Sequence, residues 1–201
     1  MATTAAPYGL RPLNLIGGQV FAGSTRQIKI ASGQTTNIFY GDIVAIDATA
    51  GTIVKVTATG TDGTTNALPA GVVGVFLGCT YTDPTLKYKL NSQYWPSGTV
   101  ASDAMAYVCD DPDTLFQIQA SGTVAQTSLG ANFPLVQTAG STTTGDSKVA
   151  LAYSLGGTDT FLPLRLVDFV NGPFSTVGDA YTDCIVKFNF GIHSYYSATG
   201  V

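Results

Sequence analysis

The sequence predicts an all-β fold, and three observations lead to this expectation. Glu is absent, so all 13 acidic residues are Asp, a residue that favours turns and caps over helix interiors. The chain holds 23 Gly and 9 Pro, which divide it into short elements. Val, Ile, Thr, Tyr and Phe dominate between these breaks, and such residues favour strands. We therefore expect a small barrel or sandwich.

The first 24 residues predict an extended N-terminal arm, and residues 25–201 a single β-rich domain. Prolines and a Gly-Gly pair interrupt the arm, and apolar anchors lie between them: Tyr8, Leu10, Leu13, Leu15 and Ile16. Anchors spaced in this way are typical of a segment that lies along another surface, its own or a partner's.

Four segments in the first half of the domain predict strands. Residues 26–30 alternate polar and apolar side chains, residues 38–47 contain a turn at Gly41-Asp42, and residues 51–60 alternate again. The fourth segment, residues 72–83, carries no charge before Asp83. The spacing of these segments is that of a meander in a small barrel or sandwich.

The stretch "PAGVVGVFLGC", residues 69–79, carries three glycines and no charge. A phosphate-binding loop would need a helix after the glycines and a Lys-Ser/Thr pair at its end. Cys79 and Thr80 offer neither. The glycines indicate a strand that bends or that another backbone approaches closely. The uncharged run indicates that both faces of the strand are covered.

The second half of the chain predicts further strands around a long excursion. Strands are expected at 104–109 and 115–120, and residues 121–157 form a Gly/Thr-rich surface loop. Residues 160–169 and 182–195 then close the domain. In the last strand we expect one apolar face, made of Val186, Phe188, Phe190 and Ile192.

Composition excludes several classes of function. Hydrophobic residues make up 45% of the chain and charged residues 11%, whereas disorder needs the reverse balance. The formal net charge is −4 and no basic run occurs, which argues against binding nucleic acid. The start of the chain lacks the pattern of a signal peptide, and no apolar run has the length of a membrane span. We expect synthesis in the cytoplasm and no membrane partner.

No motif requires catalysis. His193 is the single histidine, and no Gly-x-Ser-x-Gly turn accompanies it, so we expect a packed or exposed tail residue. Cys79, Cys109 and Cys184 are far apart and are interpreted as small buried hydrophobes in a reducing compartment. The sequence predicts no catalytic residue and no cofactor.

Three acidic residues, Asp110, Asp111 and Asp113, flank a proline. Asp is common in turns because its carboxylate bonds the nearby backbone, so a solvated turn is the simpler interpretation. Clustered carboxylates also suit Ca²⁺, but their spacing does not match an EF-hand loop. We expect no metal site.

A polar stretch with four aromatics offers a binding surface. Tyr81, Tyr88, Tyr94 and Trp95 lie within 15 residues. Exposed aromatics on β-domains stack on sugar rings or anchor protein interfaces. The stretch therefore keeps a carbohydrate-binding module open as a hypothesis.

Several segments of the chain together resemble virion structural proteins of tailed bacteriophages, notably marine ones. They run from about Tyr8 to Asn189: "YGLRPLNLIGGQVFAGSTRQIKI", "IFYGDIVAID", "AGVVGVFLGCTYTD", "AYVCDDPDTLFQIQASG", "LPLRLVDF" and "DAYTDCIVKFN". The central block also resembles head decoration, or cement, proteins.

The resemblance implies a capsid decoration protein on the outer surface of the virion. Such proteins bind after the shell expands and clamp neighbouring major capsid subunits, and many are trimers. The implied partners are the major capsid protein and the protein itself, as a homotrimer or a dimer. The implied fold is a β-tulip-like or jelly-roll-like barrel or sandwich with an extended arm and a loop excursion. A neck, tail or fibre-base protein is the alternative within the virion.

Aromatic and arginine side chains dominate protein interfaces in general. The candidate partner-binding residues are therefore taken from the arm and from the aromatic stretch: Tyr8, Leu10, Arg11, Leu13, Tyr94 and Trp95.

Overall fold

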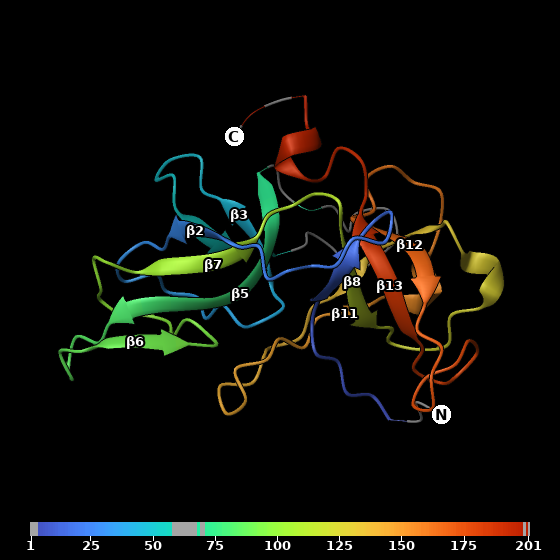
Figure 1. Cartoon of the computed structure of the whole chain (residues 1–201), viewed down its shortest axis with the longest axis horizontal. Coiled ribbons are helices and arrows are strands. Elements are labelled where there is room, and N and C mark those ends of the chain that lie inside the picture. Colours follow the sequence, from blue (N-terminus) through green and yellow to red (C-terminus); the bar gives the residue numbers. More distant parts are fainter. Residues whose placement is uncertain (1–3, 58–67, 69–70, 199, 201) are drawn as a thin grey trace.

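The computed structural model describes residues 4–57, 68, 71–198 and 200, and these residues form an all-β protein. Figure 1 shows the two main antiparallel sheets, with the six-stranded sheet on the left and the five-stranded sheet on the right. The arrangement is sandwich-like, and the described strands do not close into a barrel. Within the described ranges, no helix is long and apolar enough to cross a membrane.

The five-stranded sheet joins the start of the chain to its end. Its order is β1-β8-β13-β12-β9, and its neighbouring strands are antiparallel. The bounds are β1 (Arg11–Leu15), β8 (Thr114–Gln119), β9 (Asn132–Phe133), β12 (Leu164–Phe169) and β13 (Asp183–Phe188).

The six-stranded sheet has the order β2-β7-β5-β3-β4, with β6 also paired to β5. Its bounds are β2 (Arg26–Lys29), β3 (Ile43–Ile46), β4 (Ile53–Lys55), β5 (Val72–Thr82), β6 (Lys89–Ser92) and β7 (Met105–Cys109). A small third sheet pairs β10 (Leu135–Val136) with β11 (Ala150–Leu151). Three short 3-10 turns complete the described elements: η1 (Gln126–Ser128), η2 (Tyr153–Leu155) and η3 (Ser194–Tyr196).

Strand β5 confirms the interpretation of the glycine-rich run. The pairing register shifts opposite Gly74 on the β3 side and beside Gly78 on the β7 side. A Cβ built on Gly74 would lie 2.0 Å from the carbonyl oxygen of Cys109, so another backbone does pass closely. Each bulge moves the alternation of side chains by one residue and bends the strand.

The six-stranded sheet is covered on both faces, which explains why β5 carries no charge. Ile43 and Val75 face the five-stranded sheet and pack in the same cluster as Phe116. On the opposite face, Phe76 packs in a second cluster with Trp95. The predicted strands at 26–30, 72–83, 104–109 and 115–120 are confirmed within one residue at each end. Residues 58–60 of the predicted strand 51–60 lie outside the described residues.

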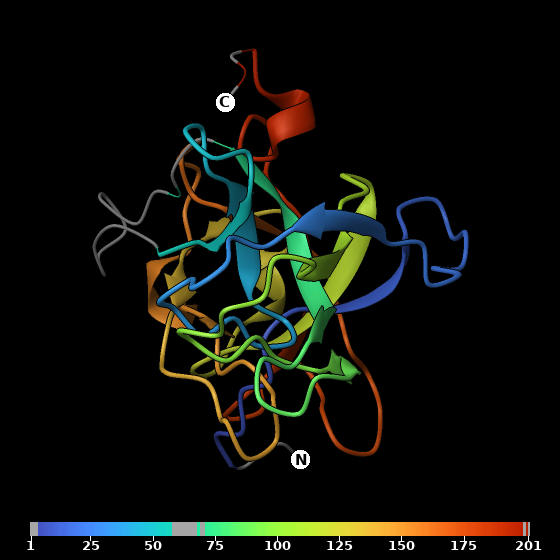
Figure 2. The ribbon, with the colours of Figure 1, turned by 90° about the vertical axis from the view of Figure 1, so that its left-hand side faces the viewer.

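Much of the predicted arm lies along the chain's own surface, one of the two surfaces that were expected for it, and it is a strand of a sheet rather than a separate arm. Residues 11–15 form β1, which pairs with β8 at the edge of the five-stranded sheet. The amide of Leu10 donates to the carbonyl of Gly41 at 3.0 Å, and the Leu10 side chain is fully buried. The segment is incorporated because its apolar anchors find their partners within the chain. The loop joining β1 to β2 stands away from the body, and it is the blue loop in Figure 2.

The predicted excursion at 121–157 is wrong as a surface loop. Its residues form β9, β10 and β11, and it contributes buried side chains to the core between the sheets. These side chains are Val124, Phe133, Leu135, Val149 and Leu151. The Gly/Thr-rich part is therefore a short turn within a segment whose apolar residues are scattered rather than periodic.

The expected apolar face of the last strand is partly wrong. Val186 and Phe188 are buried, whereas Phe190 is 77% exposed. Strand β13 ends at Phe188, and the amide of Ile192 donates to the carbonyl of Asn189 in a turn. Because the backbone turns there, the alternation of the strand does not continue.

Candidate interaction surface

Strand β1 and the residues before it place Tyr8 beside Arg11. The Arg11 guanidinium lies 4.5 Å from the centroid of the Tyr8 ring, within cation–π range. The Tyr8 hydroxyl donates to Asp183 Oδ1 at 2.9 Å. Burial raises the pKa of Tyr8, and the Asp183 carboxylate raises it further. Tyr8 is thus a fixed neutral side chain, and it supports an arginine that remains half-exposed.

Asp146 connects this pair to the six-stranded sheet. Its Oδ1 lies 3.9 Å from Arg11 Nη2 and accepts a hydrogen bond from Gln93 Nε2 at 2.9 Å. Gln93 follows β6 directly and precedes Tyr94. We name these residues the β1 face: Tyr8, Arg11, Gln93, Asp146 and Asp183. The β1 face crosses the boundary between the two main sheets.

A buried ion pair lies at the same boundary. The Asp42 carboxylate is within 2.8 Å of Lys55 Nζ and accepts a hydrogen bond from Ser147 Oγ at 2.6 Å. It also accepts from the amide of Phe39 at 2.9 Å. Since a buried carboxylate needs such partners, this network fixes the segment of Asp146 and Ser147 against β3.

The six predicted partner-binding residues have different positions. Tyr8 and Arg11 come together as described, and Leu13 is 45% exposed on β1. Tyr94 is half-buried, and its ring stacks on Phe39 with centroids 5.6 Å apart. The prediction that Leu10 and Trp95 bind a partner is wrong, because both side chains are fully buried in the core and leave no atoms for a partner.

The aromatic stretch from Tyr81 to Trp95 offers less surface than its sequence indicates. Tyr81 and Trp95 are buried and form an edge-to-face pair with centroids 5.1 Å apart. Of the four aromatics, Tyr88 alone is mostly exposed. The stretch therefore contributes mainly to the core beneath the six-stranded sheet.

The turn after β7 is held by cations. Asp110 Oδ2 lies 2.7 Å from Arg26 Nε, and Asp113 Oδ1 lies 2.6 Å from Lys187 Nζ. The hydrogen bond to Lys187 lowers the pKa of Asp113. Asp111 accepts from the amide of Asp113 at 2.8 Å, as expected of a turn. Within the described ranges, no three Cys, His or Asp side chains are grouped as a metal site.

The C-terminal turn η3 packs against this region. His193 is buried, makes an edge contact with Phe188, and accepts from the amide of Tyr195 through Nδ1 at 3.2 Å. Burial lowers the pKa of His193. The hydroxyl of Tyr196 donates to Asp113 Oδ1 at 3.1 Å. His193 is therefore a packed residue of the tail, one of the two expected outcomes.

The cysteines are free and buried, as expected of small hydrophobes. Burial raises the pKa of Cys79 and Cys184 to about 12 and that of Cys109 to about 11. Thiols with such values are not nucleophiles near neutral pH. Whether the compartment is reducing stays a prediction.

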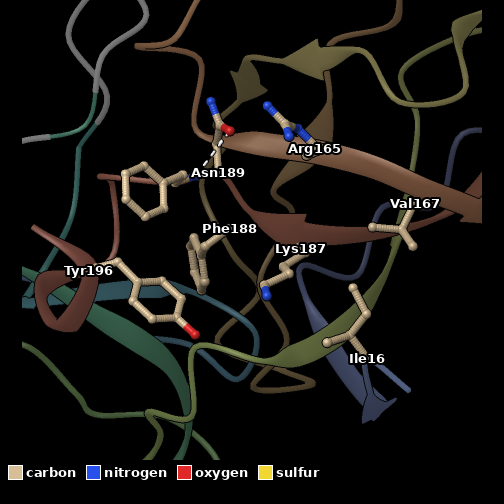
Figure 3. A pocket seen from close by; sticks show the side chains of 8 residues that line it. Ile16, Arg165, Val167, Lys187, Phe188, Asn189 and Tyr196 are labelled. Atoms are coloured by element: carbon tan, nitrogen blue, oxygen red, sulfur yellow. Dashed lines mark hydrogen bonds between the residues drawn. The ribbon is translucent and has the colours of Figure 1, made fainter. Parts of the chain in front are cut away.

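A groove of about 220 Å³ lies at the end of β12 and β13, next to η3 (Figure 3). It is lined by Ile16, Arg165, Val167, Lys187, Phe188, Asn189, Phe190 and Tyr196. Sequence reasoning missed this site, because its residues come from β1, β12, β13 and the tail. The sequence did hold a signal for it, a single basic residue in each of the apolar segments "LPLRLVDF" and "CIVKFNF". In the structure Arg165 is exposed and Lys187 is half-exposed, and the residues on either side of each are buried.

The fold and these surfaces define an all-β, sandwich-like protein with a preorganised aromatic–arginine face. No protein-family model, curated protein or solved structure matches the chain. Chemically, the β1 face can donate hydrogen bonds from Arg11 to a carboxylate or a backbone carbonyl and can stack against a partner.

Proposed function

We propose that this protein is a capsid decoration protein that binds the outer surface of a major capsid protein shell and bridges its subunits. The observation that supports this proposal most strongly is that Arg11, on strand β1, lies over the ring of Tyr8. Strand β1 is itself held in place by its pairing with β8. An arginine held in this way loses little side-chain entropy on binding, and preorganised anchors of this type dominate interface energies. The resemblance of the chain's motifs to tailed-phage virion proteins supports the same function.

The physical mechanism of stabilisation is bridging. A protein that contacts several subunits makes each later contact at a high effective concentration. Because it binds the assembled shell and not the free subunits, binding shifts the equilibrium toward the assembled state. A low-charge, two-sheet body suits this role, since it transmits strain with little deformation.

Within the sandwich class, we propose a β-tulip-like or jelly-roll-like relationship, with residues 4–8 and the loop between β1 and β2 nearest the shell. A neck, tail or fibre-base protein is the alternative, and the number of copies per virion separates the two. Hundreds of copies fit decoration, and a dozen or fewer fit a neck part. A carbohydrate-binding module is less favoured, because Trp95 and Tyr81 are buried.

Co-sedimentation with empty expanded shells of the source virus tests the proposal. The unaltered protein should saturate the shells at a fixed number of copies. Arg11→Ala should weaken binding about tenfold or more, the loss typical of an interface anchor. Lys29→Ala, an exposed cation on β2, is the matched control and should bind normally. Failure of the unaltered protein to bind would refute the proposal, and normal binding by Arg11→Ala would remove the β1 face from it.

A further inference from the structure

The groove beside η3 has the size and walls of a site for one large apolar side chain. Phe190 and Tyr196 line the groove and stack with centroids 6.0 Å apart. Ile16 and Val167 lie across the groove from Tyr196 (Figure 3). Phe188 and the stem of Lys187 lie between these two sides. Pockets for small organic ligands usually exceed about 300 Å³, so a groove of about 220 Å³ fits a single side chain better.

The two cations of the groove differ in their partners. Lys187 is paired with Asp113 at 2.6 Å. Arg165 donates through Nε to Asn132 Oδ1 at 2.9 Å. Across the described part of the chain, no carboxylate lies within 4.0 Å of the Arg165 side-chain nitrogens. The groove therefore combines apolar walls with an arginine suited to an incoming carboxylate.

The chain carries the complementary feature at the other end of the same strands. Phe174 is 84% exposed, in a turn closed by the Gly172 amide, which donates to the carbonyl of Ser175 at 2.9 Å. This turn belongs to the loop that joins β12 to β13. Asp168, exposed near the end of β12, lies toward the same loop. The sheet is thus basic at its groove end and acidic and aromatic at its loop end.

We propose that the Phe174 turn of one copy inserts into the groove of a second copy, with Asp168 approaching Arg165. The turn cannot reach the groove of its own chain. Arg165 pairs with Lys187 at one end of the β12–β13 ladder, and Phe169 pairs with Cys184 at the other. At about 3.3 Å of rise per residue these ends are about 10 Å apart along β13 and about 13 Å apart along β12. Figure 1 shows the loop between β12 and β13 at the end of these strands that lies away from η3 and the groove.

The contact joins two different surfaces, so it is head-to-tail. A contact of this kind gives a closed ring when the rotation between copies closes, and an open chain otherwise. This self-association does not depend on binding to a shell, because the knob, the groove and both charges belong to this chain alone. It proposes a surface for the self-association that the resemblance to decoration proteins implies.

Sedimentation velocity of the full chain without any shell tests the proposal. The unaltered protein should form species larger than a monomer as its concentration rises to about 1 mM, the weak limit of specific association. Phe174→Asp and Ile16→Asp should each be monomeric. Val20→Asp, an exposed apolar residue of the same loop as Ile16, and Leu86→Asp, on the β5–β6 turn, should associate like the unaltered protein.

Mixing the two defective variants gives the sharpest test. A Phe174→Asp chain retains its groove and an Ile16→Asp chain retains its Phe174 turn, so their mixture should form a one-to-one heterodimer and nothing larger. Circular dichroism confirms that each variant is folded. A monomeric unaltered protein would overturn the proposal, as would association that persists in Phe174→Asp or a mixture that stays monomeric.

Discussion

The buried carboxylate of Asp42 accepts a hydrogen bond from the hydroxyl of Ser147 at 2.6 Å, across 105 residues of sequence. The same carboxylate pairs with Lys55 at 2.8 Å. This contact ties the segment between β10 and β11 to the six-stranded sheet. It also holds Asp146, the neighbour of Ser147, where that carboxylate meets Arg11 of the β1 face.

Removing the charge of Asp42 should destabilise the protein. Asp42→Asn keeps the shape of the side chain but leaves Lys55 without its carboxylate, and breaking a buried pair in this way costs about 3 kcal/mol. Urea denaturation measures the change in the free energy of unfolding. Asp168→Asn, at an exposed position, is the control and should change it by less than about 0.5 kcal/mol. Equal stability of the two variants would contradict the role given to Asp42.

Gly74→Ala should be among the most damaging small substitutions in the chain. The new Cβ would lie 2.0 Å from the Cys109 carbonyl oxygen, at a φ of +153° that disfavours a side chain. Strain of this kind costs about 3 kcal/mol or more, so we expect a large drop in the midpoint of thermal unfolding. Gly172→Ala, which has open space around it, should unfold close to the unaltered protein. A normal midpoint for Gly74→Ala would show that β5 and β7 do not approach as described.

The three cysteines should be unreactive toward a thiol reagent at about pH 8 in the folded protein. With pKa values raised to about 11 or about 12, the thiolate fraction is small, and burial blocks access. Unfolding in guanidinium should release three reactive thiols per chain. Reaction of even one thiol at native pH, without loss of the circular dichroism signal, would contradict the packing of that cysteine.

Stability should fall as the pH drops below about 6.5, in part because of His193. Burial lowers the pKa of His193, so the unfolded chain binds this proton more readily than the folded chain. The free energy of unfolding is therefore highest above the unfolded pKa and declines as the pH falls toward the folded one. The carboxylates of Asp110 and Asp111 raise the pKa of His193 and so oppose the effect of burial.

His193→Gln removes the titration and keeps a polar side chain. Urea midpoints at about pH 7.5 and about pH 5.5 should differ less in this variant than in the unaltered protein. Asp110 and Asp111 are present in both the variant and the unaltered protein. The difference between the two proteins in how far the urea midpoint changes with pH therefore reports the contribution of His193. Parallel pH profiles would show that His193 keeps its ordinary pKa.

Local pattern predicted the fold class and most strands correctly. The absence of Glu and the frequent Gly and Pro predicted an all-β chain, and the glycines of residues 69–79 predicted the bends of β5. For two segments the sequence did not indicate the observed strands, because pairing with distant parts of the chain decides whether these strands form. Residues 11–15 become a strand only because β8 offers an edge, and Leu135 and Leu151 become core only because β10 and β11 pair.

The candidate surface was predictable in part. Tyr8 and Arg11 are three residues apart, a spacing that would put their side chains on opposite faces of a regular strand. Their contact depends on the turn at Gly9, which has a φ of 75°. Trp95 was predicted to be exposed because its neighbours in the sequence are polar. Its backbone pairs with Ile38, and its ring packs in the core beside that residue. Phe174 carried a signal that could have been used, since a lone aromatic among Gly, Pro and Ser in a turn is seldom buried.

Calorimetry of expanded shells with and without the purified protein is the direct test of decoration, because a decoration protein must stabilise the assembled state. We predict that the melting temperature of the shell rises with added protein and reaches a plateau when the shell is saturated, with Arg11→Ala shifting the curve to higher concentration. A melting temperature that stays constant at every protein concentration would contradict decoration and favour the alternative, a protein of the neck or tail of the particle.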